Sequence, residues 1–186
     1  MRIISGTARG RQLAAFVGSG IRPTPDRVRE ALFSILQSRL GTFHGLKILE
    51  LFAGSGAQSL EALSRGADSA IAVDSSAQSC KLIKENAQRC KLEDRLQIVR
   101  QDVFAALSQV SGYAPFDLIL LDPPYNKQLI PRALQEIETL QLLSEDGIIC
   151  AESASNEVID DCGKLTLIAS RKYGSSTIHL FSWNED

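Results

Sequence analysis

The chain has few of the residues that build metal sites or disulfide frameworks. Its 186 residues include four cysteines and two histidines. The cysteines, which form no C-x-x-C pair, are Cys80, Cys90, Cys150 and Cys162. Structural zinc needs clustered cysteine and histidine ligands, and disulfide frameworks are typical of small secreted domains. We therefore predict reduced thiols, no metal ion and a cytoplasmic location.

Long apolar runs and targeting signals are also lacking. No run approaches the roughly 18 apolar residues that span a membrane, and residues 1–6 lack the apolar segment of a signal peptide. There is no internal repeat and no low-complexity linker. A length of 186 residues suits one domain with a substantial core and is short for two. We predict a single domain over residues 1–186, monomeric and without a membrane partner.

The charges are unevenly distributed. The formal net charge is -2 at pH 7, yet the first thirty residues carry two acidic side chains, no lysine and six arginines: Arg2, Arg9, Arg11, Arg22, Arg27 and Arg29. A basic segment on an acidic body favours contact with a polyanion, and the arginine fork suits phosphate or base contacts. We predict that residues 1–22 form a basic arm and that these arginines bind RNA. A solvated, salt-bridged surface explains the charge alone equally well.

The start of the chain has its own pattern. Weak alternation between glycines predicts a short hairpin or arm over residues 1–20. Thr24 and Pro25 then fit the cap and the first position of a helix. Apolar residues at helical spacing predict its buried face: Val28, Ala31, Leu32, Ile35 and Leu36. Arg27 and Arg29 lie off that predicted face, near the start of the helix.

Strands and helices alternate from residue 47 onward. The predicted strands are 48–52, 70–73, 96–99, 116–121 and 147–151, and the predicted helices are one that ends at 65 and those over 77–90, 103–109 and 130–141. Residues 164–172 and 176–183 are expected to close the sheet as an antiparallel pair. This order predicts an α/β fold with a doubly wound, mostly parallel, seven-stranded sheet.

A glycine turn follows the first strand of this α/β region. Gly54 and Gly56 permit a tight turn and close approach of a ligand, with a helix N-terminus behind them. A dinucleotide fold would have a third glycine at position 59, where Ser59 stands. The glycine pair alone is therefore a weak signal.

Acidic residues at the ends of successive strands strengthen that signal. Asp74 can bind both hydroxyls of a ribose, and Asp102 can accept from an adenine amine, although either could be a helix cap. Ligands of open α/β sheets lie at the carboxyl ends of the strands. We predict an adenosine-containing cofactor there, with a nicotinamide dinucleotide as the alternative. The predicted cofactor residues are Glu50, Phe52, Ala53, Gly54, Ser55, Gly56, Asp74, Ser75, Asp102 and Val103.

The sequence Asp122-Pro123-Pro124-Tyr125 follows a buried strand. Prolines cannot donate ladder hydrogen bonds, so the strand must end there. The Asp122 carboxylate and the Pro123 carbonyl can accept from both hydrogens of an exocyclic base amine, while Tyr125 stacks on the base. We predict that these four residues catalyse methylation of a nucleobase amine. The alternative, that the two prolines only end the strand, explains the prolines but requires neither the acid at Asp122 nor the aromatic ring of Tyr125.

These motifs resemble the class I S-adenosylmethionine-dependent methyltransferases that act on amino groups. Over nearly the whole chain the sequence is similar to the RsmD family, the bacterial 16S rRNA guanine-N2 methyltransferases. The similarity rests on residues 2–6, 9–11, 22–33, 51–56 and 60–67 and on the ending around residues 173–174. The N-terminal part is the specific one, because Asp-Pro-Pro-Tyr is shared with DNA amino methyltransferases.

The resemblance implies a Rossmann-like class I fold and S-adenosyl-L-methionine as cofactor. It implies methylation of a guanine in 16S rRNA, within the small ribosomal subunit or an assembly intermediate, with the N-terminal arm on the RNA. Glu50 occupies a position where an aspartate is common in the family, a difference that leaves an acidic side chain at this position. Two alternatives remain open: a DNA adenine-N6 or cytosine-N4 methyltransferase, and a non-catalytic RNA-binding assembly factor.

Overall fold

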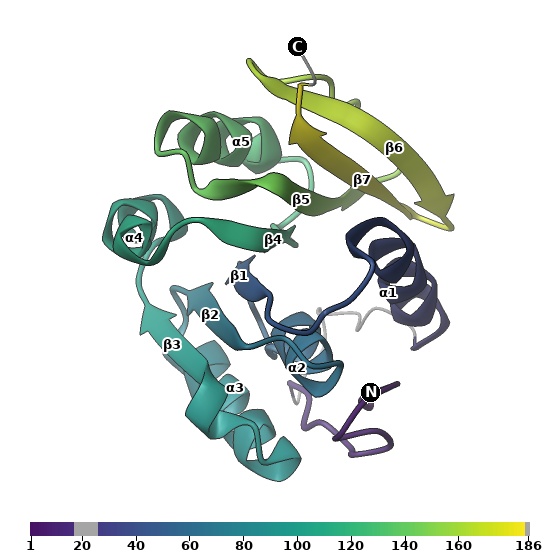
Figure 1. Cartoon of the computed structure of the whole chain (residues 1–186), viewed down its shortest axis with the longest axis vertical. Coiled ribbons are helices and arrows are strands. Elements are labelled where there is room, and N and C mark those ends of the chain that lie inside the picture. Colours follow the sequence, from purple (N-terminus) through teal and green to yellow (C-terminus); the bar gives the residue numbers. More distant parts are fainter. Residues whose placement is uncertain (17–25, 185–186) are drawn as a thin grey trace.

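The computed structural model describes residues 1–16 and 26–184, and Figure 1 shows one twisted sheet with helices on both faces. The sheet has seven strands in the order β3-β2-β1-β4-β5-β7-β6. Their bounds are β1 Lys47–Leu51, β2 Ser69–Asp74, β3 Leu96–Arg100, β4 Phe116–Leu121, β5 Leu143–Ala154, β6 Leu165–Tyr173 and β7 Ser176–Trp183. The predicted α/β class and strand number are confirmed.

Strands β1 to β5 run parallel, and β7 pairs antiparallel with both β5 and β6. The chain passes from β1 outward to β3 and then returns to β4 on the other side of β1. That reversal creates a switch point between β1 and β4, where ligands of open α/β sheets bind. One strand is longer than predicted: β5 begins at Leu143, where a register shift separates Phe116 from Leu118 on β4.

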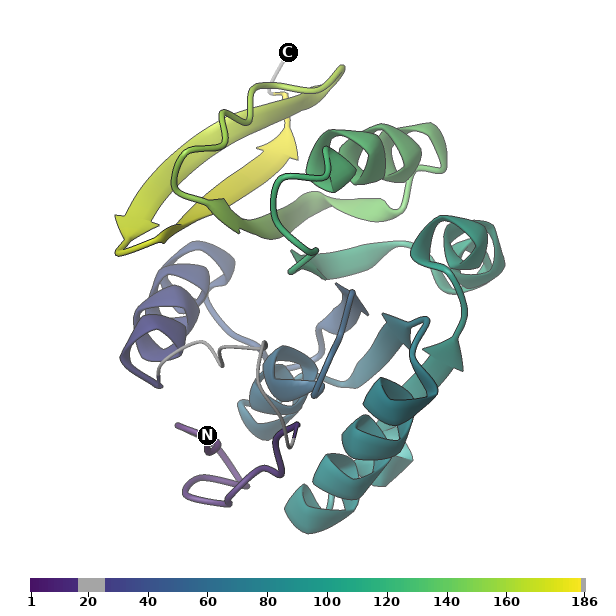
Figure 2. The ribbon, with the colours of Figure 1, turned by 180° about the vertical axis from the view of Figure 1, so that it is seen from behind.

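In the described part of the chain, five α-helices cover the sheet: α1 Asp26–Leu40, α2 Ala57–Ser64, α3 Ala77–Cys90, α4 Val103–Val110 and α5 Leu129–Thr139. Alternate residues of the central strands face opposite layers. Ile48, Leu118 and Leu120 pack with α1, α2 and α3, whereas Leu49 and Ile119 pack with α4 and α5. Figure 2 shows both layers from behind. Two cores therefore hold the strand ends in fixed positions. None of the described helices has the length and apolar character that a membrane span requires.

The buried face of α1 is rotated from the predicted one. Arg29 is 2% exposed and shares this face with Leu32, Phe33 and Leu36, whereas Ile35 is only half-buried. Positions 29, 32, 33 and 36 have helical spacing, so the face is regular. The prediction that Arg29 lies off the buried face is wrong, because it assumed that a charged residue would be exposed.

The N-terminal segment, residues 1–16, folds back on itself as a short, irregular hairpin. An isolated antiparallel bridge joins Arg2 and Gln12. The Ile3 N–H donates to the Arg11 carbonyl at 3.0 Å, and the Gly10 N–H donates to the Ile3 carbonyl at 2.9 Å. The predicted hairpin is therefore present in the described residues, although it does not extend into regular strands. It packs against α2: Glu61 accepts hydrogen bonds from the backbone N–H of Ile4 at 2.7 Å and of Ser5 at 3.1 Å. The predicted helix cap at Thr24 and Pro25, and the arginine at 22, lie outside the described residues.

Candidate active site

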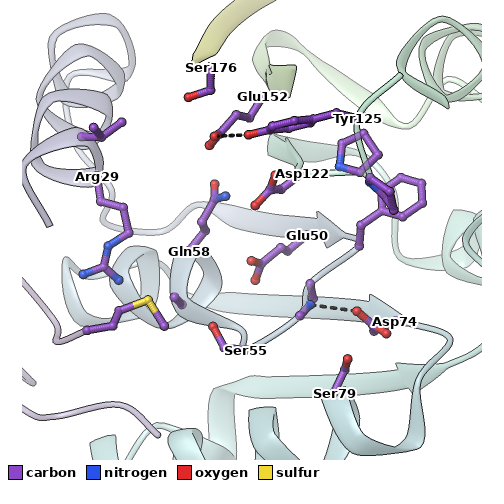
Figure 3. Close-up of a pocket in the computed structure, with 18 of the residues that line it drawn as sticks. Arg29, Glu50, Ser55, Gln58, Asp74, Ser79, Asp122, Tyr125, Glu152 and Ser176 are labelled. Atoms are coloured by element: carbon purple, nitrogen blue, oxygen red, sulfur yellow. Dashed lines mark hydrogen bonds between the residues drawn. The ribbon is translucent and has the colours of Figure 1, made fainter. Parts of the chain in front are cut away.

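A cavity of about 1270 Å³ opens at the carboxyl ends of the parallel strands. Typical small-molecule pockets occupy about 300–1,000 Å³, so this cavity has room for more than one ligand. Figure 3 shows side chains from several elements that point into it. Its lining includes the glycine turn after β1, the acid that ends β2, the acids that follow β3 and β4, and the turn between β6 and β7. The fold therefore brings the predicted cofactor residues and the predicted base-binding residues into one cavity.

The glycine turn after β1 has a strained backbone. Phe52, Gly54 and Gly56 have φ of 59°, 55° and 72°, the left-handed region that glycine adopts most readily. A Cβ at Gly56 would lie 3.0 Å from the Ile83 side chain, so the turn is held close to α3. The site requires both glycines for their backbone conformation, and Gly56 also for its close approach to Ile83.

Glu50 binds the backbone at Ser59, the position where a dinucleotide fold would have its third glycine. The Ser59 backbone N–H donates to Glu50 Oε2 at 2.9 Å, which ties the start of α2 to the end of β1. Glu50 is 3% exposed, and this burial raises the pKa of its carboxyl to about 7. A buried acid, rather than close glycine packing, fixes this helix.

Asp74 at the end of β2 holds the glycine turn. Its Oδ2 accepts from the Gly54 N–H at 2.8 Å and its Oδ1 from the Ser76 N–H at 2.9 Å. The cap of α3 is Ser76 itself, which accepts from the Ser79 N–H. Each Asp74 oxygen retains acceptor capacity for a ligand hydroxyl, while Ser75 is exposed at the cavity.

Asp102 caps a helix and also lines the cavity. Its Oδ1 accepts from the backbone N–H of Phe104 at 3.0 Å and of Ala105 at 3.2 Å, which caps α4. Val103 is buried behind it. Asp102 therefore has the helix-capping role that the sequence left open. Its Oδ2 has no hydrogen-bond partner among the residues that the structure describes.

The Asp122–Tyr125 group forms the other half of the site. Strand β4 ends at Leu121, Pro123 is buried, and Tyr125 is 39% exposed. Burial, with the nearby carboxylates of Glu152 and Glu50, raises the pKa of Asp122 to about 7. The Tyr125 hydroxyl donates to Glu152 Oε1 at 2.7 Å, as Figure 3 shows. This bond and burial raise the pKa of Tyr125.

Sequence reasoning missed Glu152. This residue is 7% exposed, lines the cavity and ends the apolar run Ile148–Ala151 of β5. Its signal was the same as that of Asp74 and Asp122: an acid at the carboxyl end of a buried parallel strand. Gln58 and residues 173–176 also line the cavity without having been predicted.

The predicted RNA-contacting arginines separate into two kinds. Arg2, Arg9, Arg11 and Arg27 are exposed, and Arg2 pairs with Asp26 at 3.2 Å. Arg29 is buried, donates to the Arg2 carbonyl and pairs with Asp26 at 3.0 Å. Burial lowers its pKa, although Asp26 opposes this shift. The prediction of Arg29 as a surface contact for RNA is therefore corrected: it joins the N-terminal segment to α1.

Comparison with known proteins shows which family the chain belongs to. The family model described as Conserved hypothetical protein 95 matches residues 1–182. The chain belongs to this family. This membership confirms the resemblance to RsmD-type methyltransferases. Among the described residues, no cluster of three or more histidine, cysteine or acidic side chains could hold a metal ion.

Individual relatives of the family extend over the whole chain. YlbH of Bacillus subtilis (strain 168), provisionally named an rRNA methyltransferase, is 36% identical over 183 residues, which cover 97% of this chain and 98% of YlbH. Ribosomal RNA small subunit methyltransferase D of Haemophilus influenzae is 30% identical over 182 residues, 97% of this chain and 93% of that protein. The solved structure of yhhF from Escherichia coli, provisionally named a methyltransferase, is 28% identical with a TM-score of 0.86 and covers 100% of this chain and 99% of its own.

Proposed function

We propose that this protein transfers a methyl group from S-adenosyl-L-methionine to the exocyclic N2 amine of a guanine in 16S rRNA. The observation that carries the proposal is that Asp122–Tyr125 lines the same cavity as the glycine turn and the acids of β2 and β3. The names of the relatives, which describe methyltransferases of ribosomal RNA, support the reaction and the substrate class. The choice of guanine N2 rests on the family resemblance.

The β1–β2 side of the cavity suits the cofactor. Asp74 can accept from ribose hydroxyls, and Asp102 Oδ2 can accept from an adenine amine. Gly54 lines the cavity, and its missing side chain leaves open space, because a Cβ there would meet only the Phe52 carbonyl oxygen at 4.0 Å, so a ligand can lie against this part of the turn. When bound, S-adenosyl-L-methionine supplies a methyl carbon made electrophilic by its sulfonium. The neighbouring carboxylate of Glu50 favours such a cationic ligand over a neutral one.

Residues after β4 prepare the amine. Asp122 and the Pro123 carbonyl accept its two hydrogens, which favours a pyramidal nitrogen with an available lone pair. Stacking on Tyr125 contributes about 1–3 kcal/mol per base in comparable sites. Methylation of the amine releases one proton, and Asp122, with its pKa raised to about 7, can take it up at neutral pH. Positioning and preorganised charge carry the catalysis.

The nucleic acid must bring one base into this cavity. A base in a duplex cannot reach such a site, so the guanine is flipped out or taken from a single-stranded loop. Arg9 and Arg11 are exposed on the N-terminal segment and Arg27 at the cavity, which suits contacts with flanking phosphates. We propose that the substrate is the small ribosomal subunit or an assembly intermediate.

The test is methyl transfer from labelled S-adenosyl-L-methionine to three acceptors. These are small ribosomal subunits, protein-free 16S rRNA and duplex DNA, and the labelled nucleoside is identified by mass. We expect N2-methylguanosine from subunits or from rRNA. Methyladenine or methylcytosine in DNA would instead support a DNA amino methyltransferase. Cofactor binding without label in any acceptor would favour a non-catalytic assembly factor.

A further inference from the structure

Glu152 lies beside Asp122 at the edge of the sheet. Leu121 of β4 pairs in register with Ala151 of β5, so the next residues along the two parallel strands, Asp122 and Glu152, are neighbours. Leu121 and Ala151 both belong to the α4–α5 core. Because side chains alternate along a strand, Asp122 and Glu152 both turn to the other layer. Figure 3 shows the two carboxyl groups close together in the cavity.

The two oxygens of Glu152 have different surroundings. Oε1 accepts the Tyr125 hydroxyl hydrogen at 2.7 Å. Oε2 has no hydrogen-bond partner within residues 1–16 and 26–184. Glu152 is 7% exposed and lines the cavity, but its Oε2 is not among the buried side-chain atoms that lack a partner. Oε2 is therefore accessible from the cavity and can accept a hydrogen bond from the ligand that stacks on Tyr125.

The nucleobases differ in what they offer at this point. The guanine amine is flanked by two ring nitrogens, of which N1 carries a hydrogen and is a donor. In adenine and cytosine the corresponding ring nitrogen has a lone pair and is an acceptor. An ionised carboxylate can only accept. A second carboxylate beside the one that binds the amine therefore complements guanine and repels the other two bases.

We propose that Glu152 selects guanine by accepting the N1–H hydrogen bond on Oε2, while Asp122 and the Pro123 carbonyl bind the amine. This inference rests on the proposed function, since it concerns the base that the same cavity accepts. The bond to Tyr125 fixes the carboxylate at the edge of the stacked ring. Guanine specificity then follows from β5, whereas Asp122–Tyr125 serves any exocyclic amine.

The test compares guanine with 2-aminopurine at the methylated position, once mass mapping has located it. Both bases carry a 2-amine, but 2-aminopurine has an unprotonated N1. RNAs that contain either base are prepared by ligation, and kcat/KM is measured for each. Wild-type enzyme should prefer guanine by at least about a hundredfold, because sites built to bind a donor reject analogues that lack it.

The Glu152→Gln variant supplies the decisive comparison. Its amide can donate to N1 of 2-aminopurine, so the preference for guanine should fall to about tenfold or less. Glu145→Gln is the matched control, because Glu145 is exposed and lies on the same strand, away from the cavity. Its guanine preference should equal that of wild type. Calorimetric binding of S-adenosyl-L-methionine checks that each variant is folded.

Two results would overturn the assignment. One is a wild-type enzyme that uses both bases equally, a measurement that needs no variant. The other is a Glu152→Gln enzyme that loses activity on both bases in the same proportion, which would make Glu152 only a support for Tyr125. If wild type forms no N2-methylguanosine on the guanine RNA, the proposed function itself fails, and the role of Glu152 fails with it.

Discussion

Glu50, Asp122 and Glu152 bring three carboxyl groups to one cavity from neighbouring strands. Burial is the largest cause of the raised pKa of Glu50 and of Asp122, both about 7, and the other carboxylates add to the shift at Asp122. Near neutral pH, Asp122 therefore exists in both protonation states. Only the ionised state can accept an amine hydrogen on either oxygen.

The rate of methyl transfer should consequently depend on pH. We expect single-turnover rates, measured at saturating cofactor, to rise from about pH 6 to about pH 8 as Asp122 loses its proton. Glu50→Gln should keep this rise but move its midpoint to lower pH, since the Glu50 charge is one cause of the raised pKa. A rate that stays flat over this range would contradict the role of Asp122.

Single site residues could be predicted where they belong to a recognisable sequence motif. Asp74 and Asp122 directly follow apolar residues, Asp102 comes two residues after the end of β3, and all three line the cavity. Glu152 also follows an apolar run, but it lies within β5 and no motif surrounds it. Arg29 misled the prediction for another reason: its burial depends on a partner in the same helix, Asp26, and on the backbone of Arg2. Side-chain type alone carries no such information.

At the scale of elements, the N-terminal segment is part of the body rather than a free arm. Glu61 of α2 is fully buried and binds the N–H groups of Ile4 and Ser5 and the side chain of Arg65. Asn86 of α3 binds both the Ala14 backbone and the Ser55 carbonyl. The segment that carries Arg9 and Arg11 is thus linked to the cofactor turn.

Glu61→Ala should detach this segment from α2. The change leaves two half-buried backbone N–H groups and Arg65 without their acceptor, so we expect a loss of about 2–4 kcal/mol in the free energy of unfolding. Urea denaturation measures this loss, and faster amide exchange at Ile4 and Ser5 locates it. Glu85→Ala, which breaks the exposed 2.6 Å pair with Arg89, is the control and should change stability by less than about 1 kcal/mol.

The exposed arginines of the segment can be tested separately. Replacing Arg9 and Arg11 with alanine should weaken RNA binding and reduce the slope of log affinity against log salt by about one per lost phosphate contact. Binding titrations at several salt concentrations measure both quantities. Arg39→Ala, at an exposed position in the last turn of α1, is the control. An unchanged slope in the double variant would mean that RNA is bound elsewhere.

The strands were predictable because each is an apolar run between turn residues. For residues 1–16, weak alternation predicted a short hairpin, and the segment does fold back on itself, with one bridge in place of regular strands. The shape of this segment is set by Glu61 and by Ser64, whose carbonyl lies so near Gly6 that a Cβ there would be 1.8 Å away. These contacts span more than fifty positions in the sequence, so a local pattern could not predict them.

At the scale of the whole molecule, burial of acids in the cavity affects folding. The folded pKa of Glu50, about 7, is above its ordinary value of 4.5, so the folded state binds this proton more tightly than the unfolded state. The resulting stability is fully present below about pH 4.5 and is lost as pH rises through about 7.

Comparison of wild type with Glu50→Gln isolates this effect. Glutamine resembles the protonated acid at all pH values, so the variant should be about as stable as wild type near pH 5. It should be more stable than wild type by about 1–3 kcal/mol near pH 8. Urea denaturation at both pH values measures the difference. A constant difference would show that Glu50 ionises as readily in the folded protein as in the unfolded chain.

The central claim is that one cavity binds the cofactor on one side and a base amine at Asp122 on the other. Single-turnover methyl transfer by Asp122→Asn, with cofactor affinity measured by calorimetry, tests this division most directly. The account predicts a rate lowered by about a hundredfold or more, with unchanged affinity for S-adenosyl-L-methionine. A rate close to that of wild type, or a loss explained entirely by weaker cofactor binding, would contradict it.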